Sequence, residues 1–386
     1  MEEDKIARIR ELMPATRRVA YLNTGTAGPL PTPVVEEMRA WVERELTQGR
    51  IGEDAHKAAD EVRARCRRAV ASVIGAAEDE VALTHFTTEG LNIVLWGIDW
   101  HPGDELVTTN LEHPAIFLPA NAVRDRFGVS LKVVDLGLGD GDIVGTLSRA
   151  LTSRTRLIAL SHVSFSTGAV LPVREIVEVA HARGIPVLVD GAQSAGALPL
   201  DMPALQADFY SIPGQKWFCG PEDTGALFVR RDSVDKVRQT FVGYASMAKG
   251  PEGSPPAPHA GARRFEVGAR HSPSIAGQAS SIEWMRDQVG LPWAHERIRQ
   301  IAASVREQLA AIAGVKILTP SNAAGLLCYS VAGADVEAMT KRLVAQGVVV
   351  RSVREPSCIR ASLGFFNTEQ DVERLAEATA KEAARS

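Results

Sequence analysis

Short apolar runs alternate with helix-like segments through the middle of this 386-residue chain. The apolar runs predict six strands, at 105–109, 131–136, 157–161, 186–190, 208–212 and 226–229. Amphipathic patterns predict helices at 33–47, 56–74, 145–151 and 173–183. Continuous apolar strands separated by helices are typical of a mostly parallel sheet with helices on both faces. We therefore expect an α/β fold.

The C-terminal third has a different pattern. Residues 250–262 are rich in Pro, Gly and Ala, which predicts a loop or a domain junction. A long helix pattern follows over about 274–313, with strand signals near 325–331 and 347–352 and a closing helix at 368–384. This order suits a smaller α+β domain. We place a large domain at 21–260 and form the small domain from 1–20 plus 261–386.

Composition and charge exclude several functions. The 43 basic and 47 acidic residues give a net charge of -4, so we expect no nucleic-acid or membrane partner. The charged first residues, MEEDKIARIRELM, predict neither a signal peptide nor an anchor. The four cysteines form no CxxC pair, which favours reduced thiols in a cytoplasmic protein. The nine histidines are dispersed, so we expect no metal site.

A lysine and an aspartate carry the main chemical signal. Asp190 ends the apolar run 187–190, and Lys216 follows in the run SIPGQKW. Pyridoxal 5'-phosphate (PLP) chemistry needs a lysine that bonds to the cofactor aldehyde and an acid that pairs with the pyridine nitrogen. Alone, a lysine in a turn is usually a surface residue and such an Asp is usually a cap. Together they predict a PLP enzyme.

Other polar residues follow neighbouring strands. His113 comes shortly after the strand ending at 109, and Thr87-Thr88-Glu89-Gly90 opens a helix pattern. Ligands of an open α/β sheet bind at the carboxyl ends of its strands. Free N–H groups at Thr88, Glu89 and Gly90 would make a phosphate site there. We expect all these residues to line one crevice.

Eight ordered runs carry a family resemblance. They are YLNTGTAGP (21–29), FTTEGLNIV (86–94), EHPA (112–115), SHVSFSTGAVLP (161–172), VLVDGAQSAG (187–196), GQKWFCGP (214–221), RRFEVG (263–268) and RASLGFFNTEQDV (360–372). With them the chain resembles the class V aminotransferase-fold PLP enzymes, which include cysteine desulfurases, cysteine/cystine C–S lyases and isopenicillin N epimerase-like proteins. The resemblance implies the fold of type I PLP-dependent transferases and a homodimer with a shared active site.

The resemblance also implies roles for individual residues. Lys216 would carry the cofactor and move the Cα proton, while Asp190 would keep the pyridine nitrogen protonated. His113 would stack on the ring, and Gln193 would bond to the phenolate oxygen. The implied cofactor-binding set is Thr88, Glu89, Gly90, His113, Asp190, Gln193, Gln215 and Lys216, with Lys216, Asp190 and His113 as its catalytic members.

Three positions depart from the family pattern. Gln215 stands where the family often has a histidine before the lysine. Ala269 stands where a threonine commonly reaches the partner's phosphate, so Arg270 or Ser272 would have to take over that contact. Phe165 replaces the asparagine of desulfurases, which would let Ser166 approach the ring instead.

The substrate residues are implied in the same way. Arg360 would grip the α-carboxylate of an amino acid in a bidentate fork, with Arg351 near the same group. Asn23 and Thr26 would line the pocket together with Gly25. Tyr244 would come from the neighbouring subunit.

The cysteines bear on the reaction. A desulfurase needs a nucleophilic cysteine on a mobile loop, whereas Cys358 lies on a predicted strand and the usual His-Cys-Ala-Gln-Pro loop is missing. We therefore predict a PLP-dependent C–S β-lyase that converts an L-cysteine derivative (cystine, an S-conjugate or a sulfoxide) to pyruvate, ammonia and a sulfur product. Alternatives are an aminotransferase, an amino-acid epimerase or a decarboxylating oxidase of S-substituted cysteine. A desulfurase and a cofactor-free binding protein are less favoured.

Overall fold

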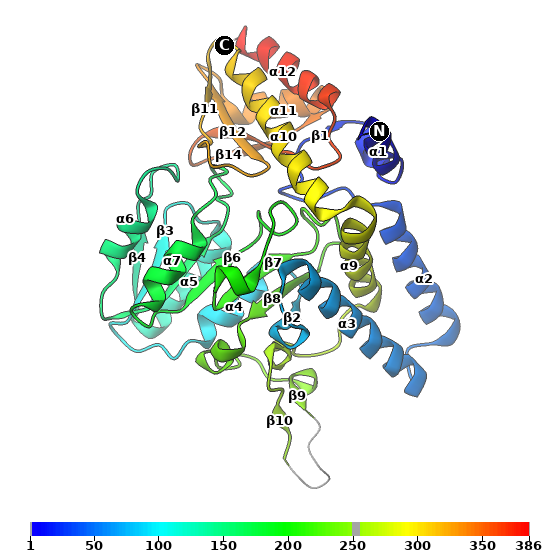
Figure 1. Cartoon of the computed structure of the whole chain (residues 1–386), viewed down its shortest axis with the longest axis vertical. Coiled ribbons are helices and arrows are strands. Elements are labelled where there is room, and N and C mark those ends of the chain that lie inside the picture. The colour runs from blue at the N-terminus through cyan, green and yellow to red at the C-terminus, as the bar shows by residue number, and fades with distance from the viewer. Residues whose placement is uncertain (1, 249–254, 386) are drawn as a thin grey trace.

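A seven-stranded sheet lies at the centre of the larger part of the molecule (Figure 1). The structure is a computed structural model that describes residues 2–248 and 255–385. The strand order is β2-β8-β7-β6-β5-β3-β4, and every strand pair from β7 to β4 is parallel. Only β8 runs antiparallel to both of its neighbours in this sheet. The strands are β2 (Val81–Thr84), β3 (Glu105–Thr109), β4 (Ser130–Val134), β5 (Thr155–Ser161), β6 (Val187–Asp190), β7 (Phe209–Pro213) and β8 (Gly225–Val229). The predicted α/β fold with a mostly parallel sheet is confirmed.

Helices cover both faces of this sheet, as the apolar runs predicted. On β6, Val187 and Val189 pack with one helical layer, whereas Leu188 between them packs with the other. This alternation follows from the two-residue period of a strand and explains why the run is apolar throughout. One layer holds α4 (Thr87–Gly97) and α5 (Pro114–Phe127), and the other holds α3 (Glu53–Ile74), α6 (Ile143–Ala150), α7 (Val173–His181) and α9 (Ser272–Trp284).

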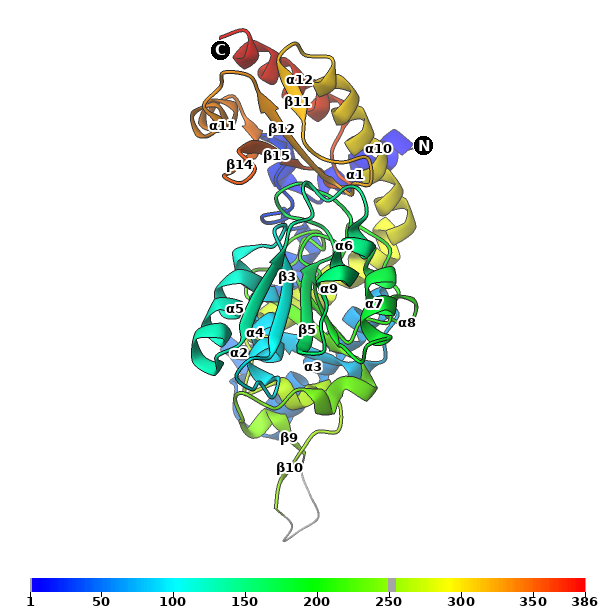
Figure 2. The same ribbon diagram turned by 90° about the vertical axis from the view of Figure 1, so that its left-hand side faces the viewer.

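A second, four-stranded antiparallel sheet lies beyond the first, in the order β11-β12-β15-β14 (Figures 1 and 2). Its strands are β11 (Val315–Ile317), β12 (Leu326–Val331), β14 (Arg351–Val353) and β15 (Cys358–Ser362). The helices around it are α10 (Leu291–Ala310), α11 (Val336–Ala345) and α12 (Glu369–Ala383). The remaining elements are α1 (Glu2–Glu11), β1 (Ala20–Tyr21), α2 (Thr32–Gln48), α8 (Met202–Leu205), β9 (Met247–Ala248), β10 (Ala257–Pro258) and β13 (Val348–Val349). Strand β1 pairs with β13, so the N-terminal segment joins this part of the molecule.

The structure differs from the sequence prediction in several places, and α5, α11 and β11 had no predicted counterpart. Strand β2 was not predicted. The single helix expected over 274–313 is instead α9 and α10, separated by a π-helical turn at Met285–Val289 and by Gly290 with a φ of 81°. Within the predicted loop 250–262, residues 250–254 lie outside the described residues, and β10 forms a short ladder with β9.

The division of the chain into domains stays a prediction. Helix α9 falls on the C-terminal side of the proposed boundary at residue 260, yet it packs against α2 and α3. Among residues 2–248 and 255–385, no helix combines the length and the hydropathy that a bilayer crossing requires.

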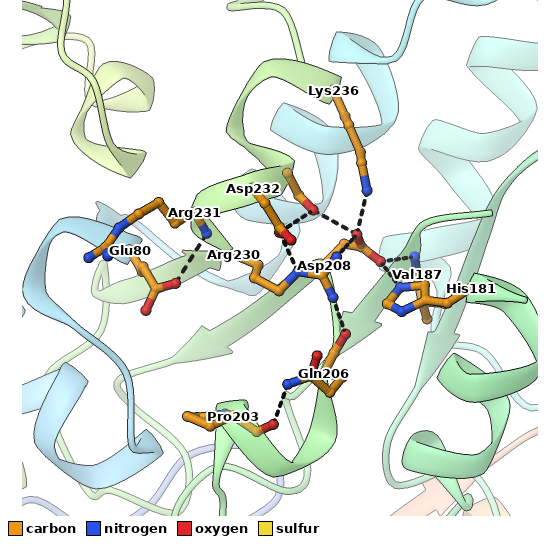
Figure 3. Close-up of polar contacts among 11 residues, drawn as sticks. Glu80, His181, Val187, Pro203, Gln206, Asp208, Arg230, Arg231, Asp232 and Lys236 are labelled. Carbon is orange, nitrogen blue, oxygen red and sulfur yellow. Dashed lines mark hydrogen bonds and ion pairs between the residues drawn. The ribbon is translucent and has the colours of Figure 1, made fainter. Parts of the chain in front are cut away.

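Two buried charge clusters hold the large sheet at its edges. Asp208, just before β7, accepts hydrogen bonds from His181 (2.7 Å), Lys236 (2.9 Å) and Arg230 (3.1 Å), as Figure 3 shows. Ser233 and the Val187 backbone N–H add two more. These contacts tie β6, β7 and α7 to the segment that follows β8.

The second cluster lies beside β2. Arg67 on α3 forms a bidentate pair with Glu266, with 2.8 Å in both contacts. Both side chains are buried, at 6% and 3% exposed. Glu266 also accepts the backbone N–H of Leu83 at 3.0 Å. Arg270 donates to the carbonyls of Leu83 and Thr84. The pair therefore fixes the strand that leads into the start of α4.

Candidate active site

A cavity of about 420 Å³ opens at the carboxyl ends of the parallel strands. Eleven of the predicted residues line it: Gly25, Thr26, Thr87, Thr88, His113, Asp190, Gln193, Gln215, Lys216, Arg351 and Arg360. Asn23, Glu89 and Gly90 do not belong to its lining. A larger groove of about 880 Å³, between α6 and α10, contains none of the predicted residues. The smaller cavity is therefore the candidate active site, because it contains the predicted residues and the larger groove does not.

Lys216 lies on the turn that follows β7 and is half-buried in the cavity wall. Burial lowers its pKa to about 8, against the opposing charge of Asp190. The positive charges of Arg360 and Arg351 lower it further. Near neutral pH a much larger fraction of this amine is neutral than for an ordinary lysine, as a nucleophile toward an aldehyde requires.

Asp190 ends β6 at the bottom of the cavity and is buried. Its Oδ1 accepts the Ala192 backbone N–H at 2.8 Å. Burial raises the pKa of Asp190, while Lys216 and this hydrogen bond act in the opposite direction. A buried carboxylate is stable only beside a positive partner, and the protonated nitrogen of a pyridine ring would be one.

His113 stands at the N-cap of α5. Its Nδ1 accepts the Ala115 N–H at 3.1 Å, which leaves the proton on Nε2. Its ring packs edge-to-face on Phe165, with the centroids 4.8 Å apart. Burial lowers the pKa of His113 to about 4, and nearby Lys216 lowers it too. The ring is therefore neutral at pH 7, which suits stacking on an aromatic cofactor.

The start of α4 lies at one end of the cavity, where the sequence predicts a phosphate site. Thr87 and Thr88 occupy the first two helical positions, and the Thr87 Oγ1 is buried without a hydrogen-bond partner. The Glu89 N–H instead donates to the Phe86 carbonyl, and its carboxylate accepts from the backbone and the ring of His85. Gly90 serves packing: a Cβ there would lie 2.2 Å from the Ser211 Oγ. Cofactor contacts by Glu89 and Gly90 stay predictions.

Two glutamines flank the lysine. Gln193 donates its Nε2 to the Gly25 carbonyl at 2.8 Å and accepts from the Trp217 indole at 3.0 Å, so its amide is fixed in orientation. One N–H of the amide stays available to the cavity. The Gln215 Oε1 is buried without a partner.

Two arginines on the small sheet close the other end. Arg360 on β15 is 1% exposed and donates to the Phe165 carbonyl and to the Thr26 Oγ1, each at 3.1 Å. Its Nε is buried without a partner. Burial lowers the pKa of Arg360 to about 10. Arg351 stands directly opposite on β14. Like charges opposite each other on paired strands are destabilising, so this pair favours an anionic ligand.

Several predicted residues lie away from the cavity. Asn23 accepts the Thr26 hydroxyl at 2.8 Å and so orients a lining residue. Ser166 is buried against Ser164. Tyr244 is 75% exposed and lines a different groove. Arg270 is committed to carbonyls of its own chain, as described above.

The structure also adds residues that the motifs did not single out. Phe86, Glu222 and Asp223 line the cavity. Asp223 has a φ of 61°, an unusual backbone for a side chain other than glycine. Glu222 and Asp223 follow the lysine closely in sequence, which was the one available signal. Nothing in the sequence predicted that backbone conformation.

Comparison with known proteins decides the family. The sequence pattern of the aminotransferase class-V family matches residues 20–375. The chain belongs to this family. It is 29% identical over 386 residues to a probable cysteine desulfurase of Methanothermobacter thermautotrophicus, with 96% of both chains covered. It is 30% identical over 400 residues to isopenicillin N epimerase of Streptomyces clavuligerus, again with 96% of each covered. The predicted resemblance is confirmed.

Solved structures agree with this result. A C-DES mutant with glycine covalently linked to its PLP cofactor superposes with a TM-score of 0.93 and 32% identity, covering 96% of this chain and 98% of that one. The cystine C–S lyase C-DES with its product cysteine persulfide gives a TM-score of 0.92 at 32% identity, covering 95% and 99%. The protein is thus a PLP-dependent enzyme of the cysteine desulfurase and C–S lyase group.

The residues of the cavity fit PLP. The orphaned Thr87 hydroxyl and the helix-start amides suit a phosphate, and the buried Asp190 suits a pyridinium nitrogen. Lys216, with its lowered pKa, suits the aldehyde. When bound, PLP supplies an electron sink for charge that develops at the substrate Cα.

Proposed function

We propose that this protein is a C–S β-lyase that converts an L-cysteine derivative, such as cystine, an S-conjugate or a sulfoxide, to pyruvate, ammonia and a sulfur product. The observation that carries this proposal is the burial of every cysteine in the chain. Cys66, Cys219, Cys328 and Cys358 are each 0% exposed. A desulfurase needs an accessible, mobile thiolate to take up sulfur.

The loop that would carry such a thiolate is also too short. Strand β14 ends at Val353 and β15 begins at Cys358, which leaves residues 354–357 as a tight turn. The Cys358 thiol faces the Ser166 carbonyl at 3.8 Å, and a hydrogen bond with Cys328, together with burial, raises the pKa of Cys358. This thiol is held in the protonated, unreactive form, which supports direct elimination over persulfide transfer.

The cavity residues account for the elimination. Arg360 holds the α-carboxylate through its free N–H groups, with Arg351 opposite. Lys216 Nζ takes the proton from Cα, and Asp190 balances positive charge at the cofactor end. The Cβ–S bond then breaks, and the sulfur leaves as a thiol after gaining a proton. Water converts the remaining three-carbon fragment to pyruvate and ammonia, so one water is consumed for each C–S bond broken.

A second candidate is epimerisation at Cα. The similarity to isopenicillin N epimerase over nearly the whole chain favours it. Proton removal by Lys216 is common to both reactions, and they differ in whether the Cβ–S bond breaks afterwards. Transamination and oxidative decarboxylation remain alternatives on the same scaffold.

Product analysis separates these reactions. We would incubate the PLP-loaded protein with L-cystine and with S-substituted cysteines, and identify the products by mass spectrometry. A lyase releases pyruvate together with thiol or persulfide, and Lys216→Ala abolishes both. A D-isomer, keto acid or aldehyde without thiol release would reject the lyase. A variant without cysteines retains turnover if the proposal is right and loses it if a persulfide is required.

The assembly and the location are part of the proposal. We infer a homodimer with shared active sites, because Phe241 and Tyr244 expose 72% and 75% of their surface on one short segment. The free cysteines support a cytoplasmic location. Light scattering on the purified protein gives the molecular mass. A monomer would reject the shared site.

A further inference from the structure

Glu112 is a buried carboxyl group beside the cofactor acid that the reaction described above does not use. It lies between the end of β3 and the start of α5, and it is 3% exposed. Its two oxygens accept hydrogen bonds from the hydroxyls of Thr109 and Ser161, both at 2.6 Å. Ser161 in turn stands opposite Asp190 in the register of β5 and β6. The carboxyl group is thus part of the floor on which Asp190 lies.

The surroundings of Glu112 disfavour a negative charge. Within residues 2–248 and 255–385, no lysine, arginine or histidine forms an ion pair with it. The charged group that acts on it is Asp190, which has the same sign. A buried carboxylate without a cation is costly, and a second carboxylate nearby adds to the cost. Burial raises the pKa of Glu112 to about 8, although the Ser161 and Thr109 hydrogen bonds oppose the shift.

A neutral acid fits the hydrogen bonds. Protonated on Oε2, Glu112 donates to the Ser161 hydroxyl while Oε1 still accepts from Thr109. Thr109 Oγ1 also accepts the Leu111 N–H at 3.1 Å, so Glu112 and Thr109 together shape the turn that leads to His113. The two carboxyl groups therefore have opposite tasks: Asp190 must be ionised to pair with the ring nitrogen, and Glu112 must be neutral to leave that charge undisturbed.

We propose that Glu112 is a positioning residue, a carboxylic acid kept neutral in the working enzyme, which links the ends of β3 and β5 and whose ionisation sets the alkaline limit of the cofactor site. The proposal rests on PLP binding and on no particular substrate. Its test is therefore made without substrate, and a wrong substrate assignment would leave the result unchanged.

The experiment follows the holoenzyme from pH 6 to 10. We would record the visible absorbance of the bound cofactor and the thermal unfolding midpoint for the wild type, Glu112→Gln and the exposed control Glu175→Gln. Glutamine keeps the shape and stays neutral. We expect Glu112→Gln to move the alkaline transition of the absorbance upward by about one pH unit or more, with the control unchanged.

Unfolding supplies a readout that a merely structural role would not move. The folded form holds a proton that the unfolded form loses above the ordinary pKa of 4.5. Stability contributed by this group therefore falls as pH rises toward about 8. The unfolding midpoint should decline less steeply over pH 6–8 in Glu112→Gln than in the wild type.

Identical pH profiles for the wild type and Glu112→Gln would overturn the proposal. If Glu112→Gln does not fold, Ser161→Ala is the second variant. The Ser161 hydroxyl donates more strongly to the ionised carboxylate than it accepts from the neutral acid, and it thereby lowers the pKa of Glu112. Its removal should raise that pKa, so the alkaline transition should again move upward. An unmoved or lowered transition in Ser161→Ala would also overturn the proposal.

Discussion

Removing one partner of the buried pair between Arg67 and Glu266 should destabilise the fold far more than replacing both partners. Removing Glu266 leaves the guanidinium of Arg67 in a site where it is 6% exposed. Removing one partner of such a buried pair costs about 3–5 kcal/mol of unfolding free energy, because the remaining charge has lost both water and its counterion. We expect this loss for Glu266→Leu and again for Arg67→Met.

The double variant should be much milder. Apolar side chains in place of both partners remove the uncompensated charge, and the main remaining cost is the Leu83 N–H that Glu266 no longer accepts. An unsatisfied buried donor costs about 1–3 kcal/mol. Independent single losses would sum to about 6–10 kcal/mol, so the two substitutions should offset each other strongly.

Urea unfolding followed by far-UV circular dichroism measures these differences. The holoenzyme of each variant is unfolded under one buffer condition, and the free energies are compared in a double-mutant cycle. Glu175→Gln on the exposed face of α7 is the control. The reasoning is wrong if the double variant is as unstable as the sum of the single variants, or if Glu266→Leu costs less than about 1 kcal/mol.

Four further predictions follow from the geometry of the site and of the sheet edge. Arg360→Lys should lower kcat/KM by roughly 10–100-fold, because a lysine cannot reproduce the paired hydrogen bonds of the planar guanidinium to a carboxylate, which contribute about 1.5–3 kcal/mol. Retained activity in steady-state kinetics would contradict the carboxylate role. The rate at which the cofactor-free chain captures PLP should rise with pH through about 8 and then level off, because only the neutral Lys216 amine attacks; a midpoint near 10.5 in stopped-flow absorbance would be inconsistent with its lowered pKa. Asp190→Asn should reduce turnover by about a hundredfold or more through lost charge stabilisation, and unchanged turnover would remove Asp190 from the catalytic set. Asp208→Asn should lower the unfolding free energy by more than about 2 kcal/mol with little effect on kcat, since its bonds to His181, Arg230 and Lys236 lie away from the cavity; a variant as stable as the wild type would show that the cluster is dispensable.

The last substitution also has a pH signature. Burial alone would raise the pKa of Asp208, but hydrogen bonds from His181, Ser233 and Lys236 hold it below its ordinary value of 3.8. Because the folded-state pKa is lowered, the stabilisation is present above 3.8 and is lost as the pH falls through the lower folded value. Acid unfolding of Asp208→Asn should therefore be less steep below pH 4 than that of the wild type.

Much of the fold could be predicted because strands buried on both faces leave a strong signal. Strand β3 matches its predicted bounds at Glu105–Thr109, and helices α3, α6 and α7 differ from their predicted ends by a few residues. Strand β2 left no comparable signal because it is four residues long and follows the acidic turn Glu78–Glu80. The break between α9 and α10 depends on Gly290 and the neighbouring turn, which a helical period over 274–313 does not reveal.

The site was predictable where position along the sheet decides the contact. Asp190, His113 and Lys216 follow strand ends, and the topology brings strand ends together. At a helix start, side-chain orientation depends instead on which neighbouring groups form hydrogen bonds with the first residues. The Glu89 side chain lies toward His85, and its N–H donates to the Phe86 carbonyl, so this amide is engaged within the chain. That Glu112 has hydroxyl partners but no cationic one among the described residues could be recognised only from the three-dimensional structure.

The residues that line the cavity come from two different sheets, which has a consequence for the evolution of such enzymes. The residues proposed to bind the cofactor lie at the ends of strands of the seven-stranded sheet, whereas both arginines proposed to bind the substrate come from the four-stranded one. Replacements on β12, β14 or β15 can therefore alter which amino acid is held without disturbing the acid, the lysine or the phosphate site. The cofactor-binding residues can therefore be inherited unchanged while the substrate changes. The similarity of this chain both to a probable desulfurase and to an epimerase is consistent with such a division.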